Sequence, residues 1–436
     1  MLRRIPLHWQ VLGALPVAVL TGMVTGTDSA LFGVTFYSIF DFAGTLFLNA
    51  LKMLVVPLVV ASIITGVAGL GGGHGLGRLG LKTVLYYLST SFLAILIGLV
   101  LVNVIQPGQV NGEPAQELLG LTQDSDSVAD KVADKGGGDI AAVFLRMIPP
   151  NIVEAAAEGQ MLGLIFFCLL FGYFMSRIDN GPATTVRQFW QGVFDIMMRM
   201  ADWVMKFTPI GVFALVAKVF AATGFDAFAP LLAFFFTVLA ALAVHFFVVL
   251  PSLVWFLGGV NPLRHYRAMA PALLTAFSTS SSSATLPVTI ECVEKNAGVS
   301  NRTSSFVLPL GATINMDGTA LYECVAAMFI AQVYGLELSF ATQFTIVLAA
   351  LLTSVGVAGI PSASLVAIAI ILGTIGLPAE GIAIILAVDR ILDMCRTSVN
   401  VFSDATGAVV MARLEGEQNV LAGSTGDPVA RRAERE

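Results

Sequence analysis

Long, unbroken stretches of apolar residues run through most of the chain. Clear examples cover residues 11–26, 85–105 and 231–257, and only His245 and Pro251 interrupt the last of them. A helix needs about 20 apolar residues to cross a bilayer, whereas a barrel strand needs about 10 in which apolar and polar positions alternate. Because these stretches are long and do not alternate, they predict an all-α polytopic membrane protein.

Charges between the stretches predict the topology, because basic loops remain on the cytoplasmic side. Arg177 and Arg187 bracket one loop, Arg264 and Arg267 mark another, and the long loop after Ile105 is mainly acidic. Six spans account for this alternation. The first stretch resembles a signal peptide, but no cleavage-site pattern follows it, and we interpret it as a span.

The second half of the chain contains two apolar segments that are divided in the middle. Residues 268–293 are split by the serine run 278–283, and residues 344–377 by residues 356–364. If each segment is a hairpin that enters and leaves on one side, eight spans and two re-entrant hairpins place both termini in the cytoplasm. The hairpin–helix units then form an inverted repeat, as in secondary transporters with a site near the bilayer midplane. A loose loop outside the membrane remains the alternative for the serine run.

The last span carries a row of polar residues. Five of them are three or four residues apart and share one helix face, namely Asp389, Asp393, Arg396, Asn400 and Asp404. A charge in the middle of the bilayer costs a few kcal/mol on insertion scales. An amphipathic helix facing water is the alternative, but the membrane character of the chain favours a functional site. Arg390 lies beside this row, and we assign it no role.

The seventh span holds polar residues next to glycines. Asn315, Asp317 and Thr319 lie mid-span with Gly311 and Gly318, which weaken a helix and free backbone carbonyls. Carboxylate, amide and carbonyl oxygens together suit a hard cation. A kinked helix around a hydrogen-bonded aspartate is the alternative.

Composition agrees with the membrane prediction and excludes other classes. Charged residues make up 12% of the 436 residues, and hydrophobic residues 56%, whereas soluble proteins carry roughly 25% charged residues. The net charge of −6 comes without a basic tract, so nucleic acid is not an expected partner. No G-x-S-x-G sequence occurs, which argues against a serine protease and, with the other features, against an enzyme. The polar tail after Arg413 is expected to carry no structure.

Four motifs resemble the glutamate/aspartate transporter family of dicarboxylate/amino acid:cation symporters. They are SSSSATLP (280–287), NMDGTALYE (315–323), GVAGIPSAS (356–364) and DMCRTSVNVFSD (393–404). The resemblance implies a homotrimer in the cell membrane, in which a mobile domain moves like an elevator against a scaffold. The expected division is scaffold 1–70, transport domain 71–106, outer loop and scaffold 107–229, transport domain 230–413 and cytoplasmic tail 414–436.

The resemblance also implies the roles of substrate-binding residues. Arg396 would clamp the side-chain carboxylate of an acidic amino acid, Asp393 would bind its ammonium group, and Asn400 its α-carboxylate. The full expected set is Ser282, Thr319, Ile360, Ser364, Asp393, Arg396, Thr397 and Asn400. Because Asp393 offers a partner for an amine, L-glutamate or L-aspartate is the expected substrate. A C4-dicarboxylate is the alternative.

Sodium ions are the expected coupling ions. The resemblance implies three sites, formed by Gly311, Asn315, Asn400 and Asp404; by Thr313, Ser354, Val355 and Val357; and by Tyr87, Thr90, Ser91, Asn315 and Asp317. Glu323 matches the proton-carrying glutamate of the family, and a buried carboxyl group away from a cation can hold a proton. The sequence therefore predicts Na⁺-coupled transport with H⁺ as a further coupling ion.

Overall fold

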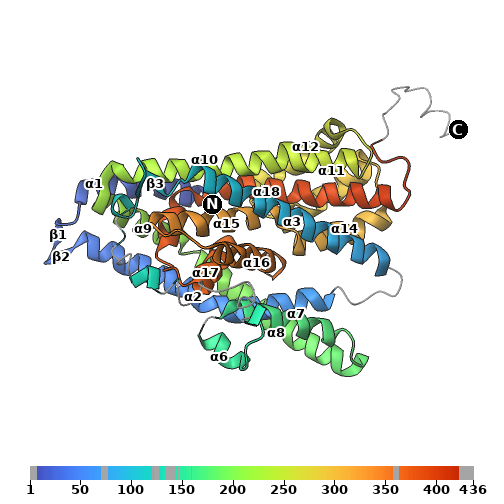
Figure 1. Ribbon diagram of the computed structural model, residues 1–436, viewed down its shortest axis with the longest axis horizontal. Coiled ribbons are helices and arrows are strands. Elements are labelled where there is room, and N and C mark those ends of the chain that lie inside the picture. Colours follow the sequence, from blue (N-terminus) through green and yellow to red (C-terminus); the bar gives the residue numbers. More distant parts are fainter. Residues whose placement is uncertain are drawn as a thin grey trace, which may run out of the picture.

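The chain is almost entirely helical, as the apolar stretches predict (Figure 1). The computed structural model describes residues 7–69, 77–119, 121, 127–130, 132, 144–145, 147–158, 160–356 and 363–421. Side chains of neighbouring helices interdigitate to form one extensive apolar core. A second apolar cluster lies around the end of the last helix and the first hairpin.

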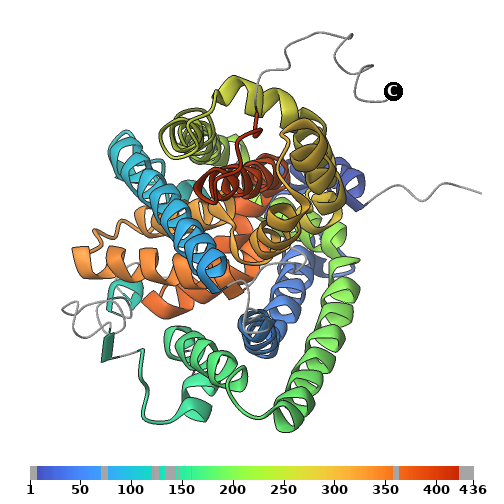
Figure 2. The same cartoon turned by 90° about the vertical axis from the view of Figure 1, so that its right-hand side faces the viewer.

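One group of helices comes mainly from the first half of the chain. Its members are α1 (Leu7–Thr25), α2 (Phe36–Gly69), α7 (Met161–Met175), α8 (Asn180–Met205) and α9 (Thr208–Thr223). Helix α9 packs on α1 and α2, and α2 also packs on α7 and α8. Figure 2 shows α2, α7 and α8 on one side of the molecule.

A second group surrounds helix α15. Its members are α3 (Gly77–Ile105), α10 (Phe228–Val244), α11 (Leu250–Phe256), α12 (Pro262–Thr279), α13 (Ser282–Glu291), α14 (Asn301–Ile314), α15 (Asp317–Val333), α16 (Phe340–Gly356), α17 (Ala363–Ile375) and α18 (Gly381–Leu414). All 17 residues of α15 are buried, because α3, α10, α16, α17 and α18 pack around it. Side chains at the start of α15 are therefore held from several directions.

Short elements connect the long helices. The strands β1 (Ala30–Leu31) and β2 (Val34–Thr35) pair antiparallel with Ala30 opposite Thr35. The strands β3 (Gln109–Val110) and β4 (Glu113–Pro114) do the same with Gln109 opposite Pro114. Further short helices in the described residues are η1 (Glu117–Leu119), α6 (Ile152–Ala157) and η2 (Gly224–Ala227).

Several apolar segments are interrupted inside the helical fold. Helices α12 and α13 pack on each other, and Ser280 between them has a left-handed backbone with φ of 50°. Helices α16 and α17 also pack on each other, and the residues between them lie outside the described part of the chain. Helix α14 ends at Ile314 and α15 begins at Asp317, so the seventh apolar stretch is broken at its polar motif. The π-helical turns η3 (His245–Val249) and η4 (Cys292–Asn296) extend α10 and α13.

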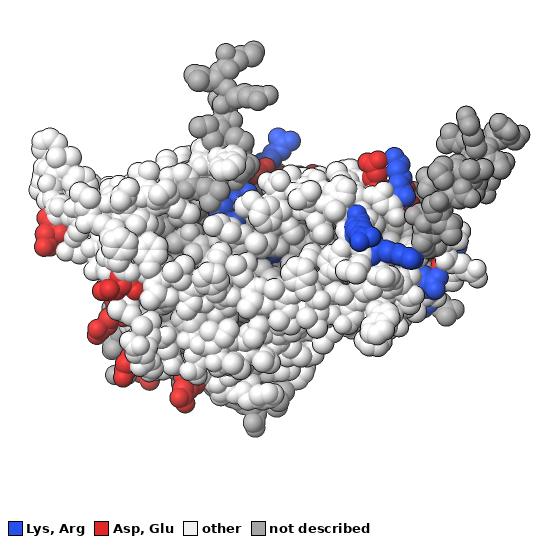
Figure 3. Space-filling model, turned by 90° about the horizontal axis from the view of Figure 1, so that it is seen from above, with Lys and Arg blue, Asp and Glu red and all other residues white. Residues whose placement is uncertain are grey.

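The helices and the surface fit a multi-pass membrane protein. Four helices in the described residues are long and apolar enough to span a bilayer, over 36–68, 79–105, 208–226 and 228–256. On the face in Figure 3, most acidic residues lie toward one end and most basic residues toward the other, with a largely uncharged band between them. The count of eight spans stays a prediction from the sequence.

The start of the polar tail is packed, contrary to the expectation of no structure. Glu417 accepts hydrogen bonds from the backbone N–H and Oγ of Ser300 (2.8 and 2.6 Å) and from Oγ1 of Thr303 (2.6 Å). Partial burial raises the pKa of Glu417, but these hydrogen bonds outweigh it and hold the pKa below its usual value. Leu421 is buried and donates to the carbonyl of Ala297. Hydrogen bonds that the composition does not reveal thus fasten residues 415–421 to the base of the first hairpin.

Candidate functional site

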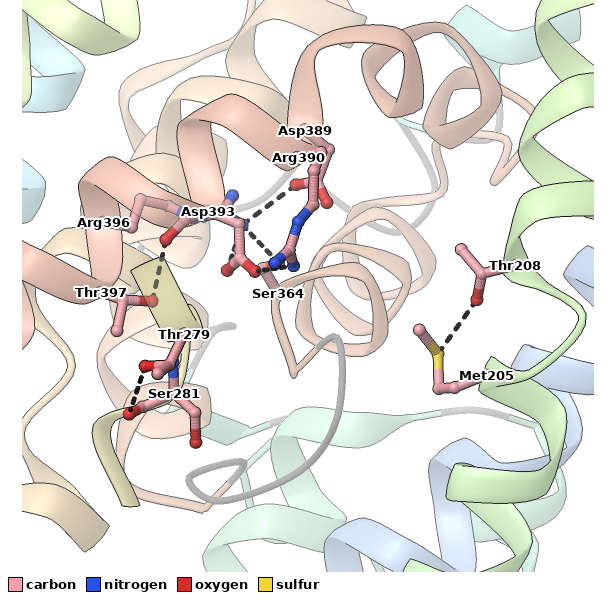
Figure 4. Close-up of polar contacts among 10 residues, drawn as sticks. All are labelled: Met205, Thr208, Thr279, Ser281, Ser364, Asp389, Arg390, Asp393, Arg396 and Thr397. Atoms are coloured by element: carbon pink, nitrogen blue, oxygen red, sulfur yellow. Dashed lines mark hydrogen bonds and ion pairs between the residues drawn. The ribbon is translucent and has the colours of Figure 1, made fainter. Parts of the chain in front are cut away.

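Arg396 is the one cation of the predicted row, and it is deeply buried. Its side chain is 1% exposed, and Nη2 donates to Oδ1 of Asp389 and Oδ1 of Asp393, each at 3.0 Å. Nη2 also lies 3.1 Å from Oγ of Ser364, in the first turn of α17 (Figure 4). Two carboxylates one helical turn apart therefore compensate the buried charge, which would otherwise be costly.

Tyr322, on α15, packs against the guanidinium group of Arg396. The central carbon of the group lies 3.8 Å from the centre of the Tyr322 ring, a cation–π contact that limits its motion. Nε and Nη1 of Arg396 are buried and have no protein partner among the described residues. A guanidinium group with unpartnered N–H donors can bind a carboxylate through charge-assisted hydrogen bonds.

A cavity of about 230 Å³ is lined by Asp389 and Asp393, the two carboxylates that hold Arg396. Asp389, Arg390 and Asp393 line it from α18, and Thr279 and Leu365 from the two hairpins. The opposite wall comes from the other helix group and consists of Val11, Met205, Thr208 and Val212. Figure 4 shows Met205 and Thr208 facing the acidic residues across this space. The volume is below the roughly 300–1,000 Å³ of drug-sized pockets, so the cavity suits a small solute.

Asn400 joins α18 to the start of α15. Its Nδ2 donates to Oγ1 of Thr319 at 3.0 Å, and its Oδ1 accepts from the backbone N–H of Gly318 at 2.8 Å. A Cβ atom at Gly318 would lie 2.8 Å from the carbonyl oxygen of Arg396, so this close approach requires glycine. Thr397 donates to the carbonyl of Asp393. The start of α15 is therefore locked against the polar face of α18.

Asp317 is the centre of a second buried polar cluster. Oδ1 accepts from Ser91 at 2.7 Å, and Oδ2 accepts from Ser403 at 2.6 Å. Nε2 of His245 lies 2.9 Å from Oδ2, and because an ionised carboxylate only accepts, this nitrogen carries the hydrogen. The three donors come from α3, α18 and the π-helical turn η3.

Asn315 and Asp404 extend the same cluster. Nδ2 of Asn315 donates to Oδ1 of Asp404 at 2.9 Å and to Oγ of Ser403 at 3.0 Å. A Cβ atom at Gly311 would lie 2.6 Å from Oδ1 of Asp404 and from the hydroxyl of Tyr87, so glycine is required there too. Among the described residues, no Lys or Arg forms an ion pair with Asp317 or Asp404. Buried carboxylates need a compensating charge, and these oxygens fit a hard cation.

Glu323 lies one turn beyond Thr319 on α15 and is fully buried. Its Oε2 accepts from Oγ1 of Thr353 on α16 at 2.8 Å. Its Oε1 has no partner among the described residues. A carboxyl group with one free oxygen in an apolar surrounding is suited to hold a proton.

The predicted residues fall into three groups. One gathers near Arg396, namely Thr319, Ser364, Asp393, Thr397 and Asn400. Another gathers around Asp317, namely Tyr87, Thr90, Ser91, Gly311, Asn315 and Asp404. Of the remaining residues, Glu323 bonds to Thr353, Thr313 and Ser354 bond to their own helices, Ser282 begins α13, and Val355 lies in the last turn of α16. Val357 and Ile360 lie outside the described residues.

Sequence reasoning assigned no role to five residues of these clusters. His245 and Ser403 contact Asp317, and Thr353 contacts Glu323. Arg390 contacts Asp393, and Tyr322 contacts Arg396. A signal existed for His245, since an ionisable residue inside an apolar stretch indicates function. Ser403 and Thr353 carry no such signal, because hydroxyl groups in membrane helices usually bond to their own backbone.

Charged groups and oxygen clusters buried among apolar helices, beside a small cavity, define a membrane transporter. The family model described as the sodium:dicarboxylate symporter family matches residues 7–414. The chain belongs to this family and is a transporter, not an enzyme.

Relatives from bacteria and animals extend along nearly the whole chain. A proton/sodium-glutamate symport protein of Geobacillus stearothermophilus is 35% identical over 419 residues, 96% of this chain and 96% of the relative. The proton/glutamate-aspartate symporter of Escherichia coli (strain K12) is 35% identical over 410 residues, 94% of this chain and 93% of the relative. Excitatory amino acid transporter 3 of Mus musculus is 37% identical over 455 residues, 94% of this chain and 86% of the relative.

Proposed function

We propose that this protein takes up L-glutamate or L-aspartate by symport with Na⁺, and with H⁺ as a further coupling ion. The observation that carries the proposal is Arg396, a buried guanidinium with unpartnered donors, held by two aspartates that line a small cavity. The names of the relatives, which include glutamate and glutamate-aspartate symporters, support the same substrate class.

The groups around the cavity match the charges of an acidic amino acid. Arg396 binds the side-chain carboxylate through its unpartnered N–H donors, and Asp393 binds the ammonium group. Asp393 is 30% exposed on the cavity side, so an amine can reach it. Thr397, Asn400, Thr319, Ser364, Ser282 and Ile360 complete the proposed site around the α-carboxylate.

Sodium ions bind at the buried oxygen clusters. Asp317 with Asn315, Tyr87, Thr90 and Ser91 forms one site, and Asp404 with Asn315, Asn400 and Gly311 forms another. The absence of Lys or Arg next to either carboxylate among the described residues supports this assignment. A third site uses the carbonyls of Thr313, Ser354, Val355 and Val357.

Transport proceeds by an elevator movement in a homotrimer. The scaffold corresponds to residues 1–70 and 107–229, and the moving domain to residues 71–106 and 230–413. The two helix groups, which pack mainly within themselves and meet at the cavity, support this division. The second hairpin acts as the gate, and both termini are cytoplasmic.

Uptake by proteoliposomes tests the proposed substrate. Labelled L-aspartate, L-glutamate and succinate are supplied while Na⁺ and pH gradients are imposed separately. We expect uptake of both amino acids to require inward Na⁺ and to exceed that of succinate. The family description names dicarboxylates, so a C4-dicarboxylate symporter is the second candidate. Faster uptake of succinate than of aspartate would favour that candidate.

Glu323→Gln tests the proton-coupling role. Glutamine keeps the size of the side chain but cannot exchange a proton, so uptake driven by a pH gradient should vanish while Na⁺-driven substrate binding persists. The measurement compares uptake with and without an inward proton gradient at fixed Na⁺. Thr353→Val, which removes the hydrogen bond to Oε2 but not the carboxyl group, is the matched control and should retain proton-driven uptake. An undiminished pH response in the glutamine variant rules out Glu323 as the carrier.

A further inference from the structure

Arg390 approaches the carboxylate that is assigned to the substrate amine. Nη1 of Arg390 lies 3.3 Å from Oδ2 of Asp393, while Nη2 of Arg396 lies 3.0 Å from Oδ1 of the same carboxylate. Asp393 is therefore bracketed by two guanidinium groups. Arg390 also lines the cavity, so its side chain faces the space that a solute would enter (Figure 4).

The two arginines are held very differently. Arg396 is 1% exposed, with three hydrogen-bond acceptors and an aromatic ring around it. Arg390 is 20% exposed, its ion pair with Asp393 is long, and its Nε has no partner among the described residues. Partly exposed ion pairs contribute little and exchange partners readily, whereas breaking a buried pair is costly. An incoming ammonium group can therefore displace Arg390 from Asp393 but not Arg396.

The charges around the cavity determine how Arg390 affects the binding of each class of acid. Asp389 and Asp393 balance Arg390 and Arg396, so this wall of the cavity is neutral overall. An acidic amino acid brings an ammonium group that competes with Arg390 for Oδ2 of Asp393. A dicarboxylate without an amine leaves the Arg390–Asp393 pair intact and is attracted by the second guanidinium group.

We propose that Arg390 is a specificity-determining residue that weakens binding of acidic amino acids and strengthens binding of C4-dicarboxylates. This inference rests on the proposed function and deepens it. Arg390 thus reduces the preference of the site for amino acids over dicarboxylates, because Asp393 attracts an amine and Arg390 competes with that amine.

The test measures dissociation constants of L-aspartate and succinate at saturating Na⁺ by titration calorimetry on the purified protein. Arg390→Gln should raise the ratio of the succinate constant to the aspartate constant about tenfold, combining a severalfold change in each direction. Arg390→Met, which keeps an unbranched apolar stem, should give the same shift and serves if the glutamine variant folds poorly. Arg390→Lys, which keeps the charge, should stay within about threefold of the original ratio.

Each outcome separates this inference from the proposed function. If the unsubstituted protein binds neither acid, the proposed function is wrong and the inference falls with it. If it binds aspartate but the ratio is unchanged in both neutral variants, only the role of Arg390 is rejected. A purely structural role would weaken both ligands alike and leave the ratio constant, which also rejects the inference.

Discussion

Replacing Arg396 by alanine should reduce the affinity for acidic substrates by at least about 100-fold and abolish their uptake. The guanidinium group is buried, and its two free donors are the proposed carboxylate clamp. Charge-assisted hydrogen bonds are among the strongest polar contacts, and losing one partner of a buried charge pair costs about 3–5 kcal/mol. Binding of L-aspartate by calorimetry and its uptake into proteoliposomes measure the effect, and size-exclusion chromatography monitors folding and assembly.

A lysine at the same position separates the charge from the geometry of the clamp. Arg396→Lys keeps a cation between Asp389 and Asp393 but loses the planar fork and part of the contact with Tyr322. We expect this variant to fold and to bind aspartate more weakly than the original protein. Normal affinity in the lysine variant would show that the shape of the guanidinium group is not needed, and normal uptake in the alanine variant would argue against any clamp at Arg396.

Asp317→Asn should raise the Na⁺ concentration needed for half-maximal aspartate binding by at least about tenfold, since hard-cation affinity depends on the number of charged oxygen ligands. The carboxylate accepts from Ser91, Ser403 and His245, and an asparagine NH₂ group would face one of these donors. The loss of charge and the mismatched donor both weaken Na⁺ binding. Aspartate binding titrated against Na⁺ at constant ionic strength provides the measurement.

Two control variants are compared with Asp317→Asn. Asp226→Asn makes the same chemical change at an exposed acid in the turn η2 and should leave the Na⁺ dependence unchanged. Ser91→Ala removes one donor but keeps the Asp317 carboxylate, so its effect should be smaller than that of Asp317→Asn. An unaltered Na⁺ requirement in Asp317→Asn would show that this cluster is not a coupling-ion site.

Features that depend on local periodicity were predictable from the sequence. The helical membrane architecture, the transporter family and the absence of enzyme activity are confirmed, because stretch length, charge content and specific motifs each reflect local chemistry. The row from Asp389 to Asp404 does lie on one continuous helix, α18. The break between α14 and α15 also falls at the glycine-containing motif. The roles of the individual site residues stay predictions.

Features that depend on contacts between distant segments were decided only by the tertiary structure. Asp317 meets Ser91, which is 226 positions away, and His245, which is 72 positions away, and no local pattern encodes either distance. The helical row likewise did not reveal that Arg390 lines a cavity, because this cavity forms only where α9 and the hairpins pack against α18. Residues 415–421 pack against the first hairpin for the same reason. Helix periodicity fixes which residues share a face, whereas burial, ion pairs and cavities arise only when several faces meet.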